Sequence, residues 1–436
     1  MKYYCLGIKG AGMSTLANIL SDLGNEVVGY DDVVEHKFTE EGLEKRHIKI
    51  YSDREHPLDK DFIVTHSVAL RSDHPELVRC QKEGLKIEKY NEILGHITSM
   101  FKTICVSGTH GKTTTSSLIT HILSSVYDVN YFIGDGSGYA SPKNDTFVIE
   151  SDEFNRHFLT YDPTYTVITN IELEHTEIYK DIEDIISTFE KFANKTKNTI
   201  IAYGDNANVR KVKFSRPVLF YGLKEENDIV CKNLILNSSG AIFDIYIKGN
   251  LVGHFELPLY GEHMVLNAMA AIAICYLEKV PLEKIQAALK NFKNAKRRFA
   301  EEKIGDTIII DDYAHHPTEI NATLAAVKQK YPEKEIIAVF KPNTYSRTEK
   351  FYKEFASVLN RADKTYLTEI ECNRERSEDY GNVTSKVIYD LLKNKEMIDD
   401  SSVSKLLKHK NGVICFMSCA SVAHMKENFE KLLRES

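Results

Sequence analysis

The sequence predicts an α/β protein built from three successive open sheets. Apolar runs typical of strands alternate with stretches typical of helices along most of the chain. Two glycine-rich loops each follow a strand-like run and precede a helical one. The length of 436 residues corresponds to about three domains at roughly 150 residues each.

The first strand–loop–helix unit begins at the amino terminus. Its expected elements are a strand over residues 2–6, a helix over 14–23 and a strand over 25–30. The loop has the glycine spacing G-x-x-G-x-G, not the G-x-G-x-x-G of dinucleotide-binding folds, with Gly7, Gly10 and Gly12. Asp31 follows the second strand, where an acidic residue can bind a ribose hydroxyl. This pattern favours a ligand with a diphosphate over a purely structural turn.

The second unit contains the stronger glycine loop. Its expected elements are a strand over 103–107, a helix over 112–124, and parallel strands buried on both faces that end at Glu150 and Ile171. Residues 228–257 alternate strand-like pieces with turn residues. They predict a small antiparallel insertion.

A third alternation follows from Thr307 to the carboxyl terminus. Its expected elements are a strand from Thr307, a helix after Pro317, a strand over 336–340, a helix after Ser346, strands over 364–370 and 413–417, and a terminal helix. The domain boundaries that follow are 1–98, 99–296 and 297–436.

Composition limits the function classes. The formal net charge is −7, from 56 Lys and Arg against 63 Asp and Glu, which argues against a basic surface for nucleic acid. No apolar run is long enough to span a membrane, and we expect no secretory signal. The eight cysteines are scattered without a C-x-x-C pair, so we expect reduced thiols in a cytoplasmic protein and no zinc.

The loop of the second unit is typical of a phosphate-binding loop. Glycines let backbone N–H groups approach phosphate oxygens, and the following helix adds the positive end of its dipole. Lys112 is expected at the β- and γ-phosphates and the Thr113 hydroxyl at Mg²⁺. Val106 replaces the first glycine of the usual motif, so the loop is a shortened variant. The alternative is a glycine turn that only begins a helix. The expected ATP contacts are Gly108, Thr109, His110, Gly111, Lys112, Thr113 and Thr114.

Two downstream residues are candidates for the metal that a nucleoside triphosphate needs. Glu150 ends a strand, as a metal-binding carboxylate would, and His175 follows the next strand. Taken singly, a strand-end Glu is more often solvated and a lone His more often structural. Their joint placement after a phosphate loop favours the metal. Two anion loops in one chain suggest a nucleotide-linked substrate together with ATP.

The motifs GIKGAGMS, GTHGKTTT, TNIELEHTEIY, NAMAAIA, KRRF, DDYAHHPTE and YSRT resemble those of the Mur ligases of peptidoglycan synthesis. They occur in the same order over nearly the whole chain, and DDYAHHPTE and YSRT are closest to the alanine-adding branch. The resemblance implies a Rossmann-like UDP-sugar domain (1–98), a central P-loop ATPase domain with an antiparallel insertion (99–296) and a Rossmann-like closing domain (297–436). It also implies movement of the closing domain on ligand binding.

The activity implied by the resemblance is ATP-dependent joining of L-alanine to the lactoyl carboxylate of UDP-N-acetylmuramic acid through an acyl phosphate. The implied cofactors are ATP and Mg²⁺. The implied partners are the two substrates, without nucleic acid or membrane, in a cytoplasmic monomer or weak homodimer.

The resemblance also implies roles for individual residues. By this resemblance, the catalytic residues are Lys112, Glu150, Asn170 and His175. The implied Mg²⁺ ligands are Thr113, Glu150 and His175. The nucleotide contacts are His263 and Asn267 at the adenine, and Arg298 and Asp312 from the closing domain. The substrate contacts are Gly10, Ala11, Gly12 and Met13 at the diphosphate, and Tyr313, His315 and Arg347 at the incoming alanine.

Three positions depart from the family pattern. Asn343 replaces a histidine, Met264 replaces an asparagine, and residues 418–420 read Ser-Cys-Ala where a G-A-G turn is expected. None of them is a metal or phosphate ligand, so we expect activity to survive with weaker substrate binding.

Three other functions remain open on the sequence. A recycling ligase would add a tripeptide to the same sugar nucleotide, through a wider amino-acid pocket. A non-catalytic protein would bind ATP without substrate-dependent hydrolysis, and the three departures are the reason to consider it. An NAD-dependent oxidoreductase would use the first glycine loop but leave GTHGKTTT unexplained.

Overall fold

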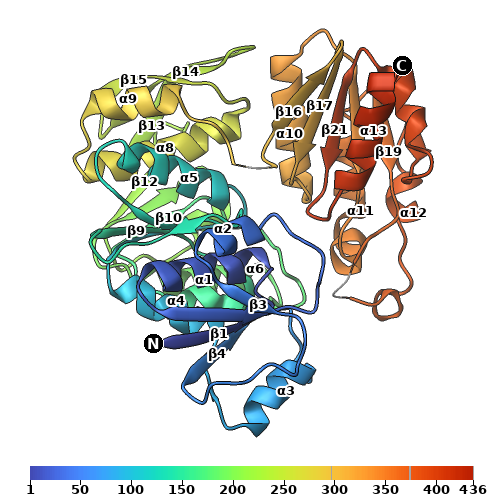
Figure 1. The fold of residues 1–436 in the computed structure, drawn as a ribbon. Coiled ribbons are helices and arrows are strands. Elements are labelled where there is room, and N and C mark those ends of the chain that lie inside the picture. The colour runs from blue at the N-terminus through green and yellow to red at the C-terminus, as the bar shows by residue number, and fades with distance from the viewer. Residues whose placement is uncertain (296, 373–374, 436) are drawn as a thin grey trace.

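Three β-sheets organise the chain in the computed structural model, which describes residues 1–295, 297–372 and 375–435 (Figure 1). The sheets contain five, ten and six strands in chain order, and helices flank each of them. The predicted α/β class with three sheets is confirmed. Lys296, the expected last residue of the central domain, lies outside the described residues, and the domain boundaries stay a prediction.

The first sheet is parallel throughout, in the order β3-β2-β1-β4-β5. Its strands are β1 (Lys2–Leu6), β2 (Glu26–Tyr30), β3 (Lys49–Tyr51), β4 (Phe62–His66) and β5 (Lys86–Ile87), and its helices are α1 (Ala11–Asp22), α2 (Glu40–Lys45), α3 (Pro75–Lys82) and α4 (Tyr90–Ser99). Helix α1 begins three residues earlier than expected. The hydroxyls of Ser14 and Thr15 both donate to the Ala11 carbonyl, so these polar residues fit inside the first turn.

The central sheet has the order β15-β14-β13-β12-β11-β10-β6-β9-β7-β8. The strands are β6 (Lys102–Ser107), β7 (Asn130–Phe132), β8 (Gly138–Tyr139), β9 (Thr146–Glu150), β10 (Tyr165–Ile168), β11 (Ile200–Tyr203), β12 (Val218–Gly222), β13 (Ile229–Asn237), β14 (Gly240–Ile247) and β15 (Asn250–Leu257). The helices are α5 (Lys112–Ser124), η1 (Phe154–Thr160), α6 (Ile182–Ala193), α7 (Ala207–Arg210), α8 (Glu262–Leu277) and α9 (Leu282–Lys290).

Two sequence expectations for this sheet have clear outcomes. The antiparallel insertion is confirmed as β13–β15, and β13 pairs in parallel with β12, so the insertion extends the central sheet. The expected strand to Ile171 was wrong in length, because β10 ends at Ile168. Its partner β6 ends at Ser107, where the chain turns into the glycine loop and leaves no strand to pair with.

The third sheet has the order β16-β17-β21-β18-β19-β20, and only β16 runs antiparallel to its neighbour. The strands are β16 (Ala300–Ile304), β17 (Thr307–Asp312), β18 (Ile336–Phe340), β19 (Lys364–Leu367), β20 (Lys395–Met397) and β21 (Val413–Met417). The helices are α10 (Pro317–Lys330), α11 (Tyr345–Leu359), η2 (Ser377–Tyr380), α12 (Lys386–Tyr389), η3 (Val403–His409) and α13 (Ala423–Glu435). The sequence missed β16 because its residues AEEKI are largely exposed and carry few apolar side chains.

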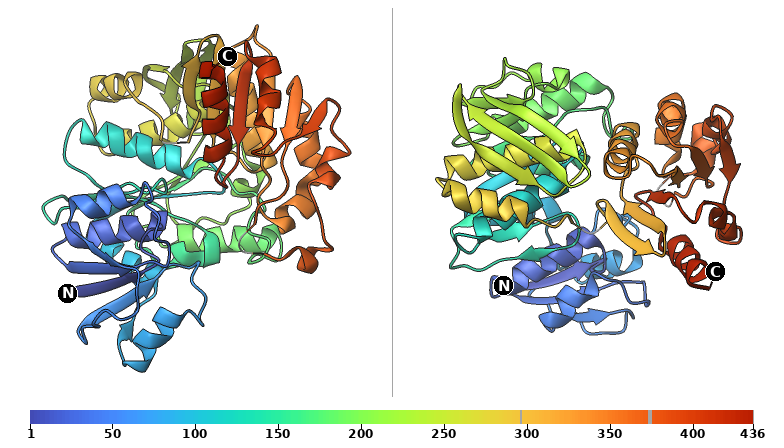
Figure 2. Two further views of the ribbon diagram at one scale, coloured as in Figure 1. Left: turned by 45° about the vertical axis from the view of Figure 1, so that its right-hand side comes forward. Right: turned by 90° about the horizontal axis from the view of Figure 1, so that it is seen from above.

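The hydrophobic cores show which parts of the chain are packed together. One buried cluster joins Leu16 of α1 and Ile93 of α4 to Ile149 of β9 and Phe189 of α6, so the first sheet and the central sheet share a core. The third sheet has its own clusters on its two faces. In Figure 1 and in the right-hand view of Figure 2 the carboxyl-terminal part forms a distinct body beside the rest. The contacts of this body with the central domain are therefore the ones that shape the site.

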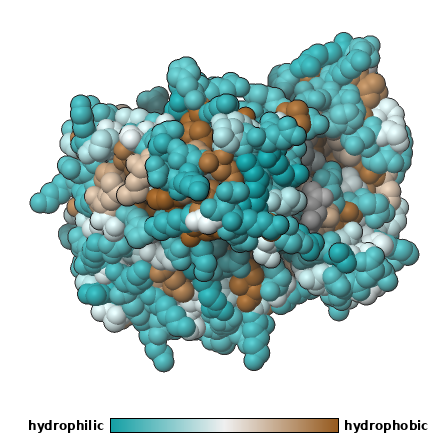
Figure 3. All heavy atoms as spheres, turned by 60° about the horizontal axis from the view of Figure 1, so that its bottom comes forward, coloured by the Kyte–Doolittle hydropathy of each residue, from teal (hydrophilic) through white to brown (hydrophobic). Residues whose placement is uncertain are grey.

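The outer surface is mostly hydrophilic on the face in Figure 3, where hydrophobic residues form small separate groups. Among the described residues, no helix combines the length and the apolar character that a membrane crossing requires.

Candidate functional site

The phosphate loop has the geometry that its glycines predict. Gly108 and Gly111 have φ angles of +135° and +83°, a region that side chains disfavour. A Cβ on Gly108 would lie 2.0 Å from the Thr169 hydroxyl, and one on Gly111 would lie 2.6 Å from Oδ1 of Asn267. Only glycine therefore fits at these two positions. Gly111 immediately precedes α5, so the N–H groups of the first helical turn face the loop.

Asn170 holds the loop in this shape. Its Oδ1 accepts from the N–H of His110 at 2.8 Å, and its Nδ2 donates to the carbonyl of the same residue at 3.0 Å. The Asn170 carbonyl also accepts from the N–H of Thr109 at 3.1 Å. The main cavity of the protein, with a volume of about 960 Å³, is not lined by Asn170. In this structure Asn170 therefore holds the loop in place, and its contact with a substrate stays a prediction.

Lys112 is surrounded by acceptors. Its Nζ lies 2.6 Å from the Gly108 carbonyl and 2.8 Å from Oε2 of Glu153. Burial works to lower the pKa of Lys112, but the negative charges of Glu153 and Asp152 outweigh it and raise the pKa well above 10.5. The ammonium group is therefore charged at neutral pH and ready to bind a phosphate.

Glu150 and Thr113 meet beside the loop. Thr113 Oγ1 donates to Oε1 of Glu150 at 3.1 Å, and the N–H of Gly134 donates to Oε2 at 2.8 Å. Nη2 of Arg298, from the third domain, donates to Thr113 Oγ1 at 3.3 Å. Burial raises the pKa of Glu150, and the charge of Lys112 opposes this shift.

Two groups of side chains have the spacing of a metal site. Asp152, Glu153 and His175 offer ligand atoms within 4.8 Å of one another, and so do the members of a second group, His110, Glu172 and His316. Carboxylate oxygens suit Mg²⁺, so the first group fits it better than the second, which has two imidazoles. The first group also adjoins Thr113 and Glu150 in the same cavity. The donor set thus fits Mg²⁺ and adds two acidic residues to the predicted ligands.

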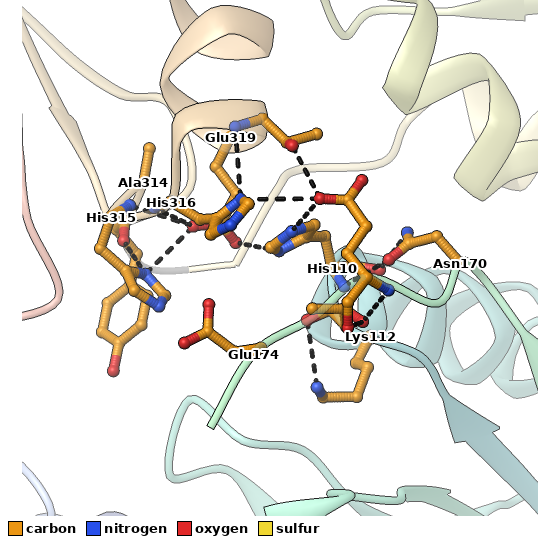
Figure 4. Close-up of polar contacts among 12 residues, drawn as sticks. His110, Lys112, Asn170, Glu174, Ala314, His315, His316 and Glu319 are labelled. Atoms are coloured by element: carbon orange, nitrogen blue, oxygen red, sulfur yellow. Dashed lines mark hydrogen bonds and ion pairs between the residues drawn. The ribbon is translucent and has the colours of Figure 1, made fainter. Parts of the chain in front are cut away.

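His110 joins the central and third domains (Figure 4). Its Nδ1 lies 3.1 Å from Oε1 of Glu319 on α10, and its Nε2 lies 3.4 Å from Oε2 of Glu172. Burial would lower the pKa of His110, but the two carboxylates raise it to about 10. Thr318 also donates to Glu172 at 2.8 Å. A charged histidine in the phosphate loop therefore links both domains.

Arg347 is paired across the same interface. Its Nε and Nη2 donate to Oε1 of Glu174 at 3.1 and 2.8 Å, and Nη1 donates to the Asn343 carbonyl at 3.0 Å. Despite its burial, the pKa of Glu174 is held far below its usual value by Arg347. The residue predicted to hold the alanine carboxylate is thus paired with a carboxylate of the chain itself.

The other nucleotide candidates of the third domain lie next to one another. The Arg298 guanidinium is 4.9 Å from the centre of the Tyr313 ring. Asp312 is buried, and its two oxygens each accept at 2.8 Å, from the N–H groups of Phe299 and Ala314. Burial raises the pKa of Asp312 to about 6, although Arg298 opposes this. In this structure Asp312 shapes the chain around Arg298 and Tyr313.

The predicted adenine pair lies on α8. Asn267 touches the phosphate loop at Gly111, as described above. His263 is one turn earlier, and burial lowers its pKa to about 4, so its ring is neutral at physiological pH. Neither residue lines the main cavity, and their contact with adenine stays a prediction.

The first glycine loop reaches the same cavity from the amino-terminal domain. Gly10 immediately precedes α1, and a Cβ on Gly12 would lie 2.9 Å from the Tyr90 hydroxyl. Asp31 accepts from the N–H groups of Lys9 and Val33 at 2.9 and 3.0 Å. Each of its oxygens accepts one hydrogen bond that closes the loop, and the expected contact of Asp31 with a ribose hydroxyl stays a prediction.

A cavity of about 960 Å³ gathers most of these residues from all three domains. Its volume is at the upper end of the usual range for ligand sites. The predicted residues that line it are Gly10, Ala11, Gly12, Met13, Thr109, His110, Gly111, Lys112, Thr113, Glu150, His175, Arg298, Tyr313, His315 and Arg347. Those outside its lining are Gly108, Thr114, Asn170, His263, Asn267 and Asp312. Thr114 instead contacts Asn294 through its hydroxyl at 3.4 Å.

Sequence reasoning missed the carboxylates that pair with the cations of the site. They are Glu153, Glu172, Glu174 and Glu319. Glu319 had a detectable signal, because it is the third residue of a helix that begins with Pro317, where a capping carboxylate is expected. The other three follow strand ends in acidic runs and gave no signal of their own.

The three departures from the family pattern have ordinary environments. Met264, in the first turn of α8, is buried in the hydrophobic core of the central domain. Asn343 donates to the Glu371 carbonyl at 2.8 Å and lines the cavity. The Ser418 hydroxyl accepts from the N–H of Ala420 at 3.0 Å, which closes the turn without glycine.

Comparison with known proteins gives a consistent family. The family model described as "Mur ligase middle domain" matches residues 106–275. The model described as "Mur ligase, glutamate ligase domain" matches residues 297–416, and the model described as "Mur ligase family, catalytic domain" matches residues 2–102. A UDP-N-acetylmuramate–L-alanine ligase of Lacticaseibacillus casei is 42% identical over 434 residues, covering 99% of each chain. The enzyme of that name from Lactococcus lactis subsp. cremoris is 41% identical over 436 residues, covering 100% of this chain and 98% of its own.

Solved structures agree. The UDP-N-acetylmuramate-alanine ligase of Thermotoga maritima superposes with a TM-score of 0.83 at 25% identity, covering 100% of this chain and 99% of its own. A murein peptide ligase of Psychrobacter arcticus shares the fold with a TM-score of 0.76 at 21% identity, covering 99% and 98%.

Proposed function

This chain belongs to the Mur ligase family, and on that premise we propose that it joins L-alanine to the lactoyl carboxylate of UDP-N-acetylmuramic acid at the expense of ATP. The observation that carries the proposal is the shared cavity. It brings the first glycine loop, the phosphate loop and Arg347 together from three domains. A sugar nucleotide, a triphosphate and an amino-acid carboxylate each have an anion-binding feature there. The names of relatives identical at 41–42% over the whole chain support the same reaction.

The chemistry explains why the site needs its cations. A carboxylate is a poor acyl donor, and transfer of the γ-phosphate to it gives an acyl phosphate with a good leaving group. Two anions must approach for that transfer, so positive charge has to offset their repulsion. Lys112 is charged and directed at the loop, and Arg298 reaches Thr113 from the third domain.

Magnesium completes the proposal. The residues that would hold it are Thr113, Glu150 and His175, with Asp152 and Glu153 beside them. Bound Mg²⁺ supplies positive charge at the phosphate oxygens. We propose a cytoplasmic location, which the eight free cysteines support. We also propose a monomer or weak homodimer.

The test is phosphate release measured over a matrix of substrates with ATP and Mg²⁺. The sugar nucleotide is combined with L-alanine, glycine, L-serine and the tripeptide in turn. We expect release that requires both the sugar nucleotide and L-alanine. Stimulation by the tripeptide in place of L-alanine would identify a recycling ligase, and ATP binding without stimulated release would identify a non-catalytic protein.

A further inference from the structure

The ring of His315 has one nitrogen engaged and one open. Its Nδ1 lies 3.0 Å from the Tyr313 carbonyl and 3.0 Å from Oε2 of Glu319. Both neighbours can only accept, so Nδ1 carries the proton in every charge state of the ring. Nε2 has no hydrogen-bond partner among the described residues, and His315 lines the main cavity. In the neutral ring, Nε2 is therefore a hydrogen-bond acceptor available to a ligand.

Glu319 and the Tyr313 carbonyl together impose this arrangement. Besides the His315 ring, Glu319 accepts from the backbone N–H groups of His315 at 3.0 Å and His316 at 3.3 Å. Its other oxygen, Oε1, lies 3.1 Å from Nδ1 of His110 in the phosphate loop. Glu319 is mostly buried on the first turn of α10, so a helix fixes its position. A carboxylate that fixes the tautomer and orientation of a histidine is the arrangement found in acid–base catalysis.

Glu174 faces the same space. In Figure 4 its carboxylate points toward the His315 ring. Oε1 accepts both hydrogen bonds from Arg347, while Oε2 is buried and has no hydrogen-bond partner among the described residues. A buried carboxylate oxygen without a donor is unfavourable. A cationic N–H group of a ligand would satisfy it.

We propose that the ammonium group of the incoming amino acid binds between Glu174 and His315, and that Nε2 of His315 takes a proton from it. Glu319 is the positioning residue that holds His315 in the required tautomer. Arg347, which is paired with Glu174, then binds the carboxylate of the same amino acid. This inference rests on the proposed function, because it assigns the base for the amide-forming step.

The protons and bonds of that step balance. One N–H proton moves from the ammonium to Nε2, which leaves a neutral amine and an imidazolium. The amine lone pair attacks the acyl carbon and forms the C–N bond, and the bond from carbon to the phosphate oxygen breaks. Phosphate leaves with that electron pair and takes the second N–H proton as hydrogen phosphate. The amide keeps the third.

A competing assignment makes a different prediction about His315. A doubly protonated ring would donate from Nε2 and bind the carboxylate of the amino acid. L-Alaninamide separates the two, because it keeps the α-ammonium group and lacks the carboxylate. Hydroxylamine is a third probe. It is uncharged at neutral pH, so it can trap the acyl phosphate as a hydroxamate without a base.

The experiment compares the full-length protein with His315→Gln in three assays, using L-alanine, L-alaninamide and hydroxylamine as acceptors. We expect His315→Gln to lower kcat about 100-fold or more with both L-alanine and L-alaninamide. Hydroxamate formation should stay within about twofold of the unaltered protein. A loss confined to L-alanine would show that His315 binds the carboxylate, and an equal loss in all three assays would show a structural role. Either result overturns the inference. If the unaltered protein forms no hydroxamate, the proposed function itself is wrong.

Two further variants test the neighbours. Glu319→Gln should lower kcat with L-alanine and shift the pH profile of kcat, and Glu319→Asp should restore part of the rate. Glu174→Gln should mainly raise KM for L-alanine and L-alaninamide. Glu335→Gln is the matched control, because Glu335 lies 3.0 Å from Nδ1 of His409 in the same domain but outside the cavity. Equal effects of Glu335→Gln and Glu319→Gln would contradict the assignment.

Discussion

At the scale of single residues, three cations of the site have a carboxylate of the chain as their partner. Lys112 pairs with Glu153, His110 with Glu319, and Arg347 with Glu174. Buried charges need such partners, because an isolated one pays a large desolvation cost. Anionic substrates can therefore bind by exchanging partners at groups that are already charged and held in place.

Lys112→Ala tests the phosphate loop. We expect turnover to fall about 100-fold or more, because no other Lys or Arg among the described residues approaches the loop carbonyls as Lys112 does. Phosphate release reports the loss, and circular dichroism checks the fold. Lys197→Ala is the control, because Lys197 pairs with Asp162 in the central domain and does not line the cavity. Normal turnover in Lys112→Ala would refute the role of the loop.

His263 gives a prediction about pH and stability. Its folded pKa is about 4 and its ordinary value is 6.5, so the unfolded chain binds the proton first as the pH falls. The contribution to stability is complete above pH 6.5 and is lost as the pH falls toward 4, by up to about 3 kcal/mol. His263→Gln should remove this component.

Urea denaturation at about pH 8 and about pH 5 measures the effect. The fall in stability between the two conditions should be smaller in His263→Gln than in the unaltered protein. The same fall in both proteins would show that His263 is not held neutral.

At the scale of elements, one side chain of α10 attaches the third domain to the insertion. Gln329 Nε2 donates to the carbonyls of Asn237 and Gly240, each at 2.9 Å, and its Oε1 accepts from the N–H of Gly261 at 2.7 Å. The amide thus uses both hydrogens and its oxygen on backbone groups of the central domain. The hairpin of β13 and β14 therefore packs within the central domain and also contacts α10 of the third domain.

Gln329→Ala should loosen this attachment. The variant leaves three backbone groups without their partner, so we expect faster proteolysis of the link between the domains and a higher KM for ATP. Gln329→Glu keeps the acceptor for Gly261 but loses both donors, and its effect should be similar or larger. Limited proteolysis with and without ATP provides the measurement. Unchanged cleavage in both variants would show that Gln329 does not control docking.

At the scale of the whole molecule, the core arrangement defines one hinge. The first two sheets share a hydrophobic cluster, whereas the third domain meets the central one at the site mainly through polar pairs. Such contacts resist separation less than a shared apolar core does. We therefore expect the third domain to be the part that opens for substrates.

Small-angle X-ray scattering tests this hinge. We expect the radius of gyration of the unliganded protein to exceed that of the protein with an ATP analogue and the sugar nucleotide. The difference between the two radii of gyration should grow with salt concentration. Salt weakens the charge pairs that hold the third domain against the central one when no ligand is bound. Superimposable curves under all conditions would argue against closure.

The sequence by itself determined the local chemistry. A strand that ends before Gly108, a helix from Lys112 and three successive sheets follow from apolar periodicity and glycine placement, which act over a few neighbouring residues. The tertiary structure alone decided which charges meet. His110 and Glu319 are 209 positions apart, and no local pattern specifies their contact. It arises because helix α10 docks on the phosphate loop and brings the buried carboxylate of Glu319 to His110. In the sequence alone, such a carboxylate cannot be told from a solvated surface charge.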